Sequence, residues 1–195
     1  MIEQSLVLIK PDGVQRSLIG TVIQRFEQVG LKISALKLVQ ATRDQADRHY
    51  ALTEEWMMAV YTKAKTKYEA DGKAFPYPDH KAYGGSIKDG LVEFLAFAPV
   101  VAMVVEGEGA VALIRKIVGA TEPASSAPGT IRGDFSHDTY AMSNLQNRPI
   151  RNLIHASGNV EEAKNELPIW FTPSEIMTIN LAVEPVQYDE KRFRA

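Results

Sequence analysis

The sequence contains no cysteine, which excludes disulfide bonds and thiolate chemistry and fits a reducing compartment. The first residues, 1–6, have neither the basic cluster nor the long apolar run of a secretory signal, and no run approaches the roughly 18 apolar residues that span a bilayer. The net charge of −2 argues against a nucleic-acid-binding protein that relies on a broad basic surface. These absences predict a soluble, cytoplasmic protein without a membrane or specific nucleic-acid partner.

The length of 195 residues and a hydrophobic content of 45% predict a single domain over residues 1–195. Neither an internal repeat nor a low-complexity tract is present. Short apolar runs predict strands at 5–9, 31–40 and 99–105, with a turn at 106–109 and a fourth strand around His155. Helical spacing predicts helices at 19–29, 42–50, 54–68, 88–97, 110–118 and 160–167, the last stopped by Pro168. This order predicts an α+β, ferredoxin-like sandwich: a four-stranded antiparallel sheet with helices packed on one face.

Three stretches have no clear period. Residues 69–86 are rich in proline and glycine and are predicted to be irregular, and they fall within an insertion at about 55–86. Residues 121–135 form a long loop, either ordered or disordered, and residues 136–149 form a second insertion. The tail at about 176–195 is predicted to be an arm, with a short strand or an extended segment at 179–183.

A histidine stands on the otherwise apolar segment Asn152-Leu-Ile-His155-Ala-Ser157, just before a predicted helix. Asn159 and Glu162 have the spacing of a capping box, which places the helix N-terminus directly after this segment. The unpaired N–H groups and dipole of a helix N-terminus favour an anion. The segment therefore suits a nucleophilic histidine that carries phosphate. The alternative is a buried histidine satisfied by hydrogen bonds.

Groups suited to phosphate binding occur at the ends of predicted elements or in loops. Arginine offers a planar fork of donors, and glycines beside it let the backbone approach a ligand. These candidates are Lys10, Arg115, Thr121 and Arg132. Each of them can equally be an ordinary solvated or surface-paired residue, because spacing alone does not show that they converge.

Six blocks of the sequence together resemble the nucleoside diphosphate kinase family, in the family's order and over most of residues 5–171. The blocks are Leu8-Ile-Lys10-Pro-Asp-Gly-Val-Gln-Arg16, His49-Tyr50, Gly90-Leu91-Val92, Pro99-Val-Val-Ala-Met103, Gly129-Thr-Ile-Arg132-Gly-Asp-Phe135 and Asn152-Leu-Ile-His155-Ala-Ser157.

The resemblance implies a ping-pong reaction, in which a nucleoside triphosphate gives its terminal phosphate to His155 and a nucleoside diphosphate then takes it. It implies that Glu166 accepts a hydrogen bond from the other imidazole nitrogen and fixes the tautomer, with Ser157 supporting the pair. A neutral imidazole is nucleophilic at pH 7, and phosphoryl transfer depends mainly on positioning and charge stabilisation.

The resemblance also implies a set of residues around the phosphates and ribose of ATP and other nucleotides: Lys10, Tyr50, Arg115, Thr121, Arg132 and Asn152. Lys10 and Asn152 are expected at the sugar hydroxyls or the transferred group, and the other cations and Thr121 at the outer phosphates. Mg²⁺ is expected to come with the nucleotide, bridging phosphate oxygens rather than held by protein carboxylates.

Two departures from the family pattern concern the site. Ile87 stands where a base-stacking phenylalanine is usual, with Leu91 as a second apolar contact, and Tyr77 or Tyr83 is a candidate for the missing ring. Gly158 stands where an aspartate usually follows the His-Ala-Ser sequence, which removes a carboxylate near His155.

Two alternatives to an active kinase are a catalytically weak nucleotide-binding or scaffold member of the same family, and an RNA-binding ferredoxin-like domain. The first is disfavoured because the implied catalytic residues are all present, and the second because the strands at 5–9 and 99–105 have no aromatic residue. The resemblance further implies a homo-oligomer, a hexamer in preference to a tetramer or dimer, with residues 121–135 and the tail at subunit contacts.

Overall fold

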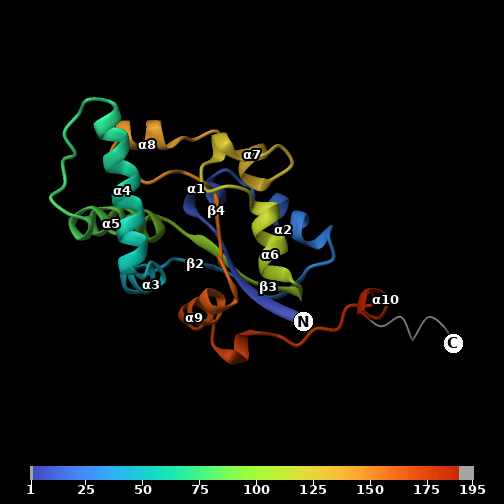
Figure 1. The fold of residues 1–195 in the computed structure, drawn as a ribbon. Coiled ribbons are helices and arrows are strands. Elements are labelled where there is room, and N and C mark those ends of the chain that lie inside the picture. The colour runs from blue at the N-terminus through green and yellow to red at the C-terminus, as the bar shows by residue number, and fades with distance from the viewer. Residues whose placement is uncertain (1, 189–195) are drawn as a thin grey trace.

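The computed structural model describes residues 2–188, and its core is a four-stranded antiparallel sheet. The strands are β1 (Ile2–Ile9), β2 (Lys32–Val39), β3 (Val100–Glu108) and β4 (Ile154–Ala156), in the spatial order β2-β3-β1-β4. Figure 1 shows β1 and β3 at the centre of the molecule. The predicted four-stranded ferredoxin-like sheet is confirmed.

Helices cover both faces of this sheet, so the expectation of helices on one face was wrong. One face packs against α2 (Ile19–Glu27) and α6 (Ala110–Val118), through inward side chains such as Val7 and Met103. The other face, which carries Leu6 and Val104, packs against α3 (Arg43–His49), α5 (His80–Phe97) and α9 (Val160–Trp170). Both faces of the central strands are buried, which explains why their sequences are continuously apolar rather than alternating.

The central pair of strands is longer than predicted. β1 begins at Ile2, which pairs with Glu108 at the far end of β3. The residues predicted to be a turn at 106–109 therefore continue β3, and the chain turns only at Gly109, whose φ of 58° suits glycine. The helix at 110–118 has the predicted bounds and ends at Gly119.

Pro168 lies inside α9 rather than ending it. Proline cannot donate to the carbonyl four residues earlier, and here that carbonyl belongs to the exposed residue Lys164, where water can replace the lost hydrogen bond. The helix continues because Trp170 and Phe171 are buried against the sheet. Tertiary packing thus overrides the local stop signal.

The first region predicted to be irregular, 69–86, is irregular at 71–79 but helical at both ends, where it belongs to a helical hairpin. α4 (Glu54–Ala70) extends to residue 70 and α5 already begins at His80, capped by the side chain of Asp79. The glycines at 84 and 85 do not break α5: a Cβ on Gly84 would lie 2.5 Å from Met57 Cγ, so glycine is what allows the two helices to approach. Figure 1 shows the hairpin standing at one side of the molecule.

The remaining loops are ordered and contain short helices. α1 (Pro11–Gln15) follows β1, and the long loop at 121–135 is ordered, with η1 (Pro123–Ser125) and α7 (Ile131–Phe135). Residues 136–149 contain α8 (Tyr140–Leu145).

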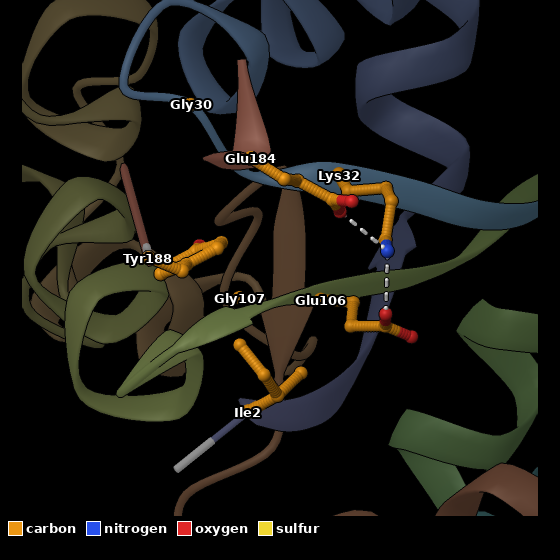
Figure 2. A pocket seen from close by; sticks show the side chains of 7 residues that line it. All are labelled: Ile2, Gly30, Lys32, Glu106, Gly107, Glu184 and Tyr188. Atoms are coloured by element: carbon orange, nitrogen blue, oxygen red, sulfur yellow. Dashed lines mark hydrogen bonds and ion pairs between the residues drawn. The ribbon is translucent and has the colours of Figure 1, made fainter. Parts of the chain in front are cut away.

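The C-terminal arm has no strand at 179–183. It passes through η2 (Pro173–Glu175) and an extended stretch to α10 (Glu184–Tyr188), and the rest of the predicted arm lies outside the described residues. Lys32 of β2 anchors it, because its ammonium contacts Glu184 of the arm at 2.8 Å and Glu106 of β3 at 2.9 Å (Figure 2). The backbone N–H of Met177 also donates to the Ser34 carbonyl on β2.

None of the helices within residues 2–188 is long and apolar enough to cross a bilayer.

Gly13 is predicted to be essential for stability, because a Cβ there would lie 2.7 Å from Ile9 Cγ2 and 3.1 Å from the Leu153 carbonyl oxygen. Gly13→Ala should lower the free energy of unfolding in urea by about 1–3 kcal/mol, the usual cost of overpacking. Gly20→Ala is the matched control, since nothing lies within 4 Å of its added methyl group in α2. Equal effects of the two substitutions would contradict the packing argument.

Candidate active site

His155 lies at the middle of β4, opposite Leu8 of the central strand β1. β4 is an edge strand, so one side of it is held by the sheet and the other is open. The His155 side chain is 20% exposed, which leaves it accessible from one direction only.

The turn that leads into β4 is strained. Leu153 has a φ of 67°, a conformation that a branched residue rarely adopts, and the Ile154 N–H donates back to the Asn152 carbonyl at 2.7 Å. The Lys10 N–H donates to the Leu153 carbonyl at 2.7 Å, and the Asp12 carboxylate accepts from the Leu153 N–H at 3.0 Å. These contacts hold both ends of the strained peptide.

The guanidinium of Arg132 spans this turn from the other side. Its Nε–H donates to the Asn152 carbonyl at 3.1 Å and its Nη2 to the Ile154 carbonyl at 2.7 Å. Its Nη1 donates to the carbonyls of Gly119 at 3.2 Å and Ala120 at 2.9 Å. A guanidinium has five N–H groups; four of them donate to the backbone, and the fifth, on Nη2, has no hydrogen-bond partner among residues 2–188.

A chain of hydrogen bonds joins the end of β1 to the loop at 121. Lys10 is buried, and its ammonium donates to the Asn152 side-chain oxygen at 2.8 Å. The Asn152 amide nitrogen in turn donates to the Thr121 carbonyl at 2.9 Å. Burial, with a smaller contribution from the Arg132 charge, lowers the pKa of Lys10 to about 8.

The imidazole of His155 is oriented by a carboxylate. Its Nε2 lies 3.0 Å from Glu166 Oε1 and 3.1 Å from Oε2, and the Ser157 hydroxyl donates to Oε2 at 2.6 Å. Because a carboxylate only accepts, the imidazole proton belongs on Nε2 and the lone pair on Nδ1.

His155 is uncharged at neutral pH. Burial, followed by the charges of Lys10, Arg132 and Arg115, lowers the pKa of its imidazole to about 3. Arg132 remains charged, although burial and the charge of Arg115 lower its pKa to about 10. The site thus holds a neutral nucleophile in a cationic environment, which suits an attack on phosphate.

The helix N-terminus after His155 differs in detail from the predicted capping box. The Asn159 side chain accepts from the Glu162 N–H at 2.8 Å, but the Glu162 carboxylate accepts from the Gly158 N–H at 2.8 Å. A Cβ on Gly158 would lie 2.6 Å from Glu162 Oε2. The carboxylate of Glu162 therefore lies next to the position that an aspartate side chain would take at residue 158.

Comparison with known proteins identifies the family of this chain. The profile of the nucleoside diphosphate kinase family matches residues 3–72 and 67–176. A nucleoside diphosphate kinase from Pyrobaculum aerophilum is 39% identical over 180 residues, which cover 90% of this chain and 98% of that protein. The chain belongs to the nucleoside diphosphate kinase family.

Solved structures of the family have the same fold. That of a kinase from Pyrobaculum aerophilum superposes with a TM-score of 0.86 at 38% identity, covering 91% of this chain and 100% of the other. That of a nucleoside diphosphate kinase from Borrelia burgdorferi, a transition-state mimic with bound vanadate and ADP, gives a TM-score of 0.77 at 36% identity over 95% of this chain and 96% of the other.

The other predicted kinase residues fall into two groups. The first group, Tyr50 and Arg115, lies near Lys10, Arg132 and His155. The buried Tyr50 hydroxyl has no hydrogen-bond partner among the described residues. Arg115 is exposed, and its charge acts on both His155 and Arg132. The second group is Ile87 and Leu91, which are half-buried on α5.

The two tyrosines considered as base-stacking residues pack elsewhere. The ring centroids of Tyr77 and Tyr83 lie 5.7 and 5.0 Å from that of Phe75, at the centre of an aromatic cluster within the α4–α5 hairpin. Tyr61 and Tyr68 of α4 also pack against Phe75, so this cluster adds apolar contacts within the hairpin.

Sequence reasoning missed His49, whose ring packs edge-on against His155 with centroids 4.4 Å apart. It had appeared only as part of the His49-Tyr50 block. It also missed Tyr140 of α8, whose side chain lies near Thr121 and Arg132 and whose ring is 5.5 Å from the ammonium of Lys63 on α4. No pattern in the sequence predicts the contact between Tyr140 and Lys63, because the two residues lie in segments far apart in the chain.

We expect Arg132 to be a major source of stability in this kinase fold. Arg132→Met would leave buried carbonyls of the strained turn without donors, so the free energy of unfolding should fall by about 3 kcal/mol or more. Arg115→Met is the matched control, because Arg115 is exposed and its loss should change stability by less than about 0.5 kcal/mol. Urea denaturation of both variants measures the difference, and a small effect for Arg132→Met would refute its bracing role.

Proposed function

We propose that residues 1–195 form one nucleoside diphosphate kinase domain, in which residues 55–86 and 136–149 are insertions and His155 is the phosphate-carrying nucleophile. The observation that carries the proposal is the hydrogen bond of His155 Nε2 to Glu166, because it leaves the Nδ1 lone pair free beside Lys10, Arg115 and Arg132.

In the first half-reaction Nδ1 of His155 attacks the terminal phosphorus of a nucleoside triphosphate. The N–P bond forms as the bond between that phosphorus and the bridging oxygen breaks, and the nucleoside diphosphate leaves with the electron pair. A second nucleoside diphosphate then attacks phosphohistidine through its terminal oxygen, which restores the neutral imidazole. Glu166, supported by Ser157, holds the Nε2 proton and stabilises the charge that develops on the ring.

The phosphates and ribose are proposed to bind to the polar cluster around the Asn152 turn. Lys10 and Asn152 are already joined by a hydrogen bond near His155, which suits contact with the sugar hydroxyls or the transferred group. The remaining N–H of Arg132, the guanidinium of Arg115, the side chain of Thr121 and the free Tyr50 hydroxyl suit the outer phosphates. Ile87 and Leu91 are proposed to cover the base.

Mg²⁺ is proposed to arrive with the nucleotide. The described residues contain one group of possible metal ligands near the site, His49, His155 and Glu166, and it offers two imidazoles and a single carboxylate. A hard cation such as Mg²⁺ prefers oxygen ligands and retained waters, so this group does not fit it. The metal would supply charge neutralisation on the phosphate oxygens.

The kinase is further proposed to be a homo-oligomer, with a hexamer favoured by the family resemblance and a tetramer or dimer as alternatives. β2 is an edge strand, and beyond the part covered by the arm it exposes Leu36 at 50% and Leu38 at 62%. Exposed apolar side chains on an unpaired edge favour pairing with a second copy. A monomeric mass by light scattering would refute this proposal.

Phosphorylation of His155 can be tested without an acceptor. The protein mixed with labelled ATP and Mg²⁺ should acquire a label that acid removes and alkali does not, and a nucleoside diphosphate should chase it. His155→Ala should lose the label while remaining folded, whereas His80→Ala and His137→Ala, which replace two other histidines, should keep it. Folded wild-type protein that binds nucleotide but never becomes labelled would favour the scaffold alternative.

The lowered pKa of Lys10 predicts proton uptake when nucleotide binds. The ammonium is charged below a pKa of about 8 and neutral above it. Bound phosphate favours the charged form, so ADP binding near pH 8 should take up about half a proton, and affinity should fall as the pH rises further. Titration calorimetry in two buffers of different ionisation enthalpy measures this uptake. It should vanish in Lys10→Met and persist in Lys65→Met, which removes an exposed lysine of α4.

A further inference from the structure

His49 is buried beside the active site without a hydrogen-bond partner. Its side chain is 0% exposed, and neither ring nitrogen has a partner among the described residues. Rings surround it: the centroids of His155, Tyr50 and Trp170 lie at 4.4, 4.8 and 5.8 Å. A buried polar group left unpaired costs free energy, and packing alone is met as well by a phenylalanine. The two nitrogens of His49 therefore require an explanation.

The nitrogens of His49 share their surroundings with two other possible ligands. Nδ1 of His49 lies 3.9 Å from Glu166 Oε1, and Nε2 of His155 lies 3.0 Å from the same oxygen. One ligand atom from each of the three residues can be chosen so that all lie within 4.8 Å of one another. Two ligands about 2.1 Å from one tetrahedral metal ion are about 3.4 Å apart, so the observed distances need only small side-chain movements to enclose an ion.

The donor set indicates the class of metal. Two imidazole nitrogens and one carboxylate suit a borderline divalent ion such as Zn²⁺ or Co²⁺ and leave one coordination position for water. We propose that His49, His155 and Glu166 form a binding site for a divalent cation such as Zn²⁺ or Co²⁺, distinct from the Mg²⁺ that accompanies the substrate.

Occupation of this site would switch off the nucleophile. An ion at Nε2 of His155 displaces the proton that Glu166 holds there, and that proton moves to Nδ1, so none is released and the imidazole stays neutral. The Nδ1 lone pair is then no longer available for attack on phosphorus. The metal-bound enzyme is inactive until the ion leaves.

The neighbouring cations determine how strongly the ion binds. Lys10, Arg115 and Arg132 all act on His155, and their charges oppose a divalent cation. A bound anion would offset this opposition, so sulfate should strengthen Zn²⁺ binding and Zn²⁺ should strengthen sulfate binding by the same factor. An exposed metal site far from Lys10, Arg115 and Arg132 would not show this coupling, so the measurement distinguishes it from the proposed site.

The first test is a calorimetric titration of the full chain with ZnCl₂, with and without sulfate. The second is a titration with CoCl₂ that is monitored by visible absorption. One ion should bind, and Co²⁺ should show the intense bands of four- or five-coordination. His49→Phe preserves the ring packing but removes both nitrogens, so the Kd should rise at least about tenfold. His80→Ala, which removes a histidine that pairs with Glu54 at 2.5 Å on the surface, should change it by less than about twofold.

His49→Gln provides a second variant should the phenylalanine disturb folding, and ¹⁵N NMR of His155 with Zn²⁺ should show the proton on Nδ1. Binding that is unchanged in both His49 variants, or lost in His80→Ala, would overturn the proposal. These readouts need no catalysis, so they remain valid whether or not His155 becomes phosphorylated.

Discussion

The brace between the buried Arg132 guanidinium and the strained Asn152–Ile154 turn is the constraint on which the site depends. Leu153 occupies a backbone conformation that is unfavourable for its side chain, and such a turn persists only where its surroundings over-determine it. Arg132 holds a carbonyl on each side of Leu153, while Asp12 and the backbone of Lys10 hold Leu153 itself. The direction in which β4 leaves the turn, and hence the position of His155, follows from these contacts.

The same buried cations also affect the protonation of His155. Desolvation makes charged Lys10 and Arg132 costly in the free protein, which is why the pKa of each is lowered. Burial, followed by the charges of these cations, lowers the pKa of His155 to about 3 and so keeps its imidazole neutral at physiological pH. An anion bound among these cations would relieve their mutual repulsion, so the free energy that this repulsion costs the free protein would favour binding of the proposed phosphate. The mutual repulsion of these charges therefore opposes stability in the free protein, although the hydrogen bonds of Arg132 to the backbone contribute to it.

Apolar patterning predicted the sheet and most helices. The closeness of His155, Glu166 and Ser157 was instead implied by the resemblance to the nucleoside diphosphate kinase family, since no local pattern links Glu166 to the histidine. The sequence did not predict that most donors of Arg132 serve backbone carbonyls, since such contacts leave no pattern in the partner residues. It also ended α9 at Pro168, where burial of Trp170 outweighs one lost hydrogen bond. The errors share one cause, which is that tertiary contacts override local signals.

The edge position of β4 reconciles rigidity with access. In a strand inside the sheet, His155 would be fully buried between two neighbouring strands, as Leu8 of β1 is. In a loop, no sheet hydrogen bonds would fix the position of its Cα atom. An edge strand normally leaves backbone groups free to pair with another chain. Here Arg132 donates a hydrogen bond to the Ile154 carbonyl, so this carbonyl is not free to pair with a strand of another chain. The edge position thus fixes the backbone of His155 while its side chain stays 20% exposed.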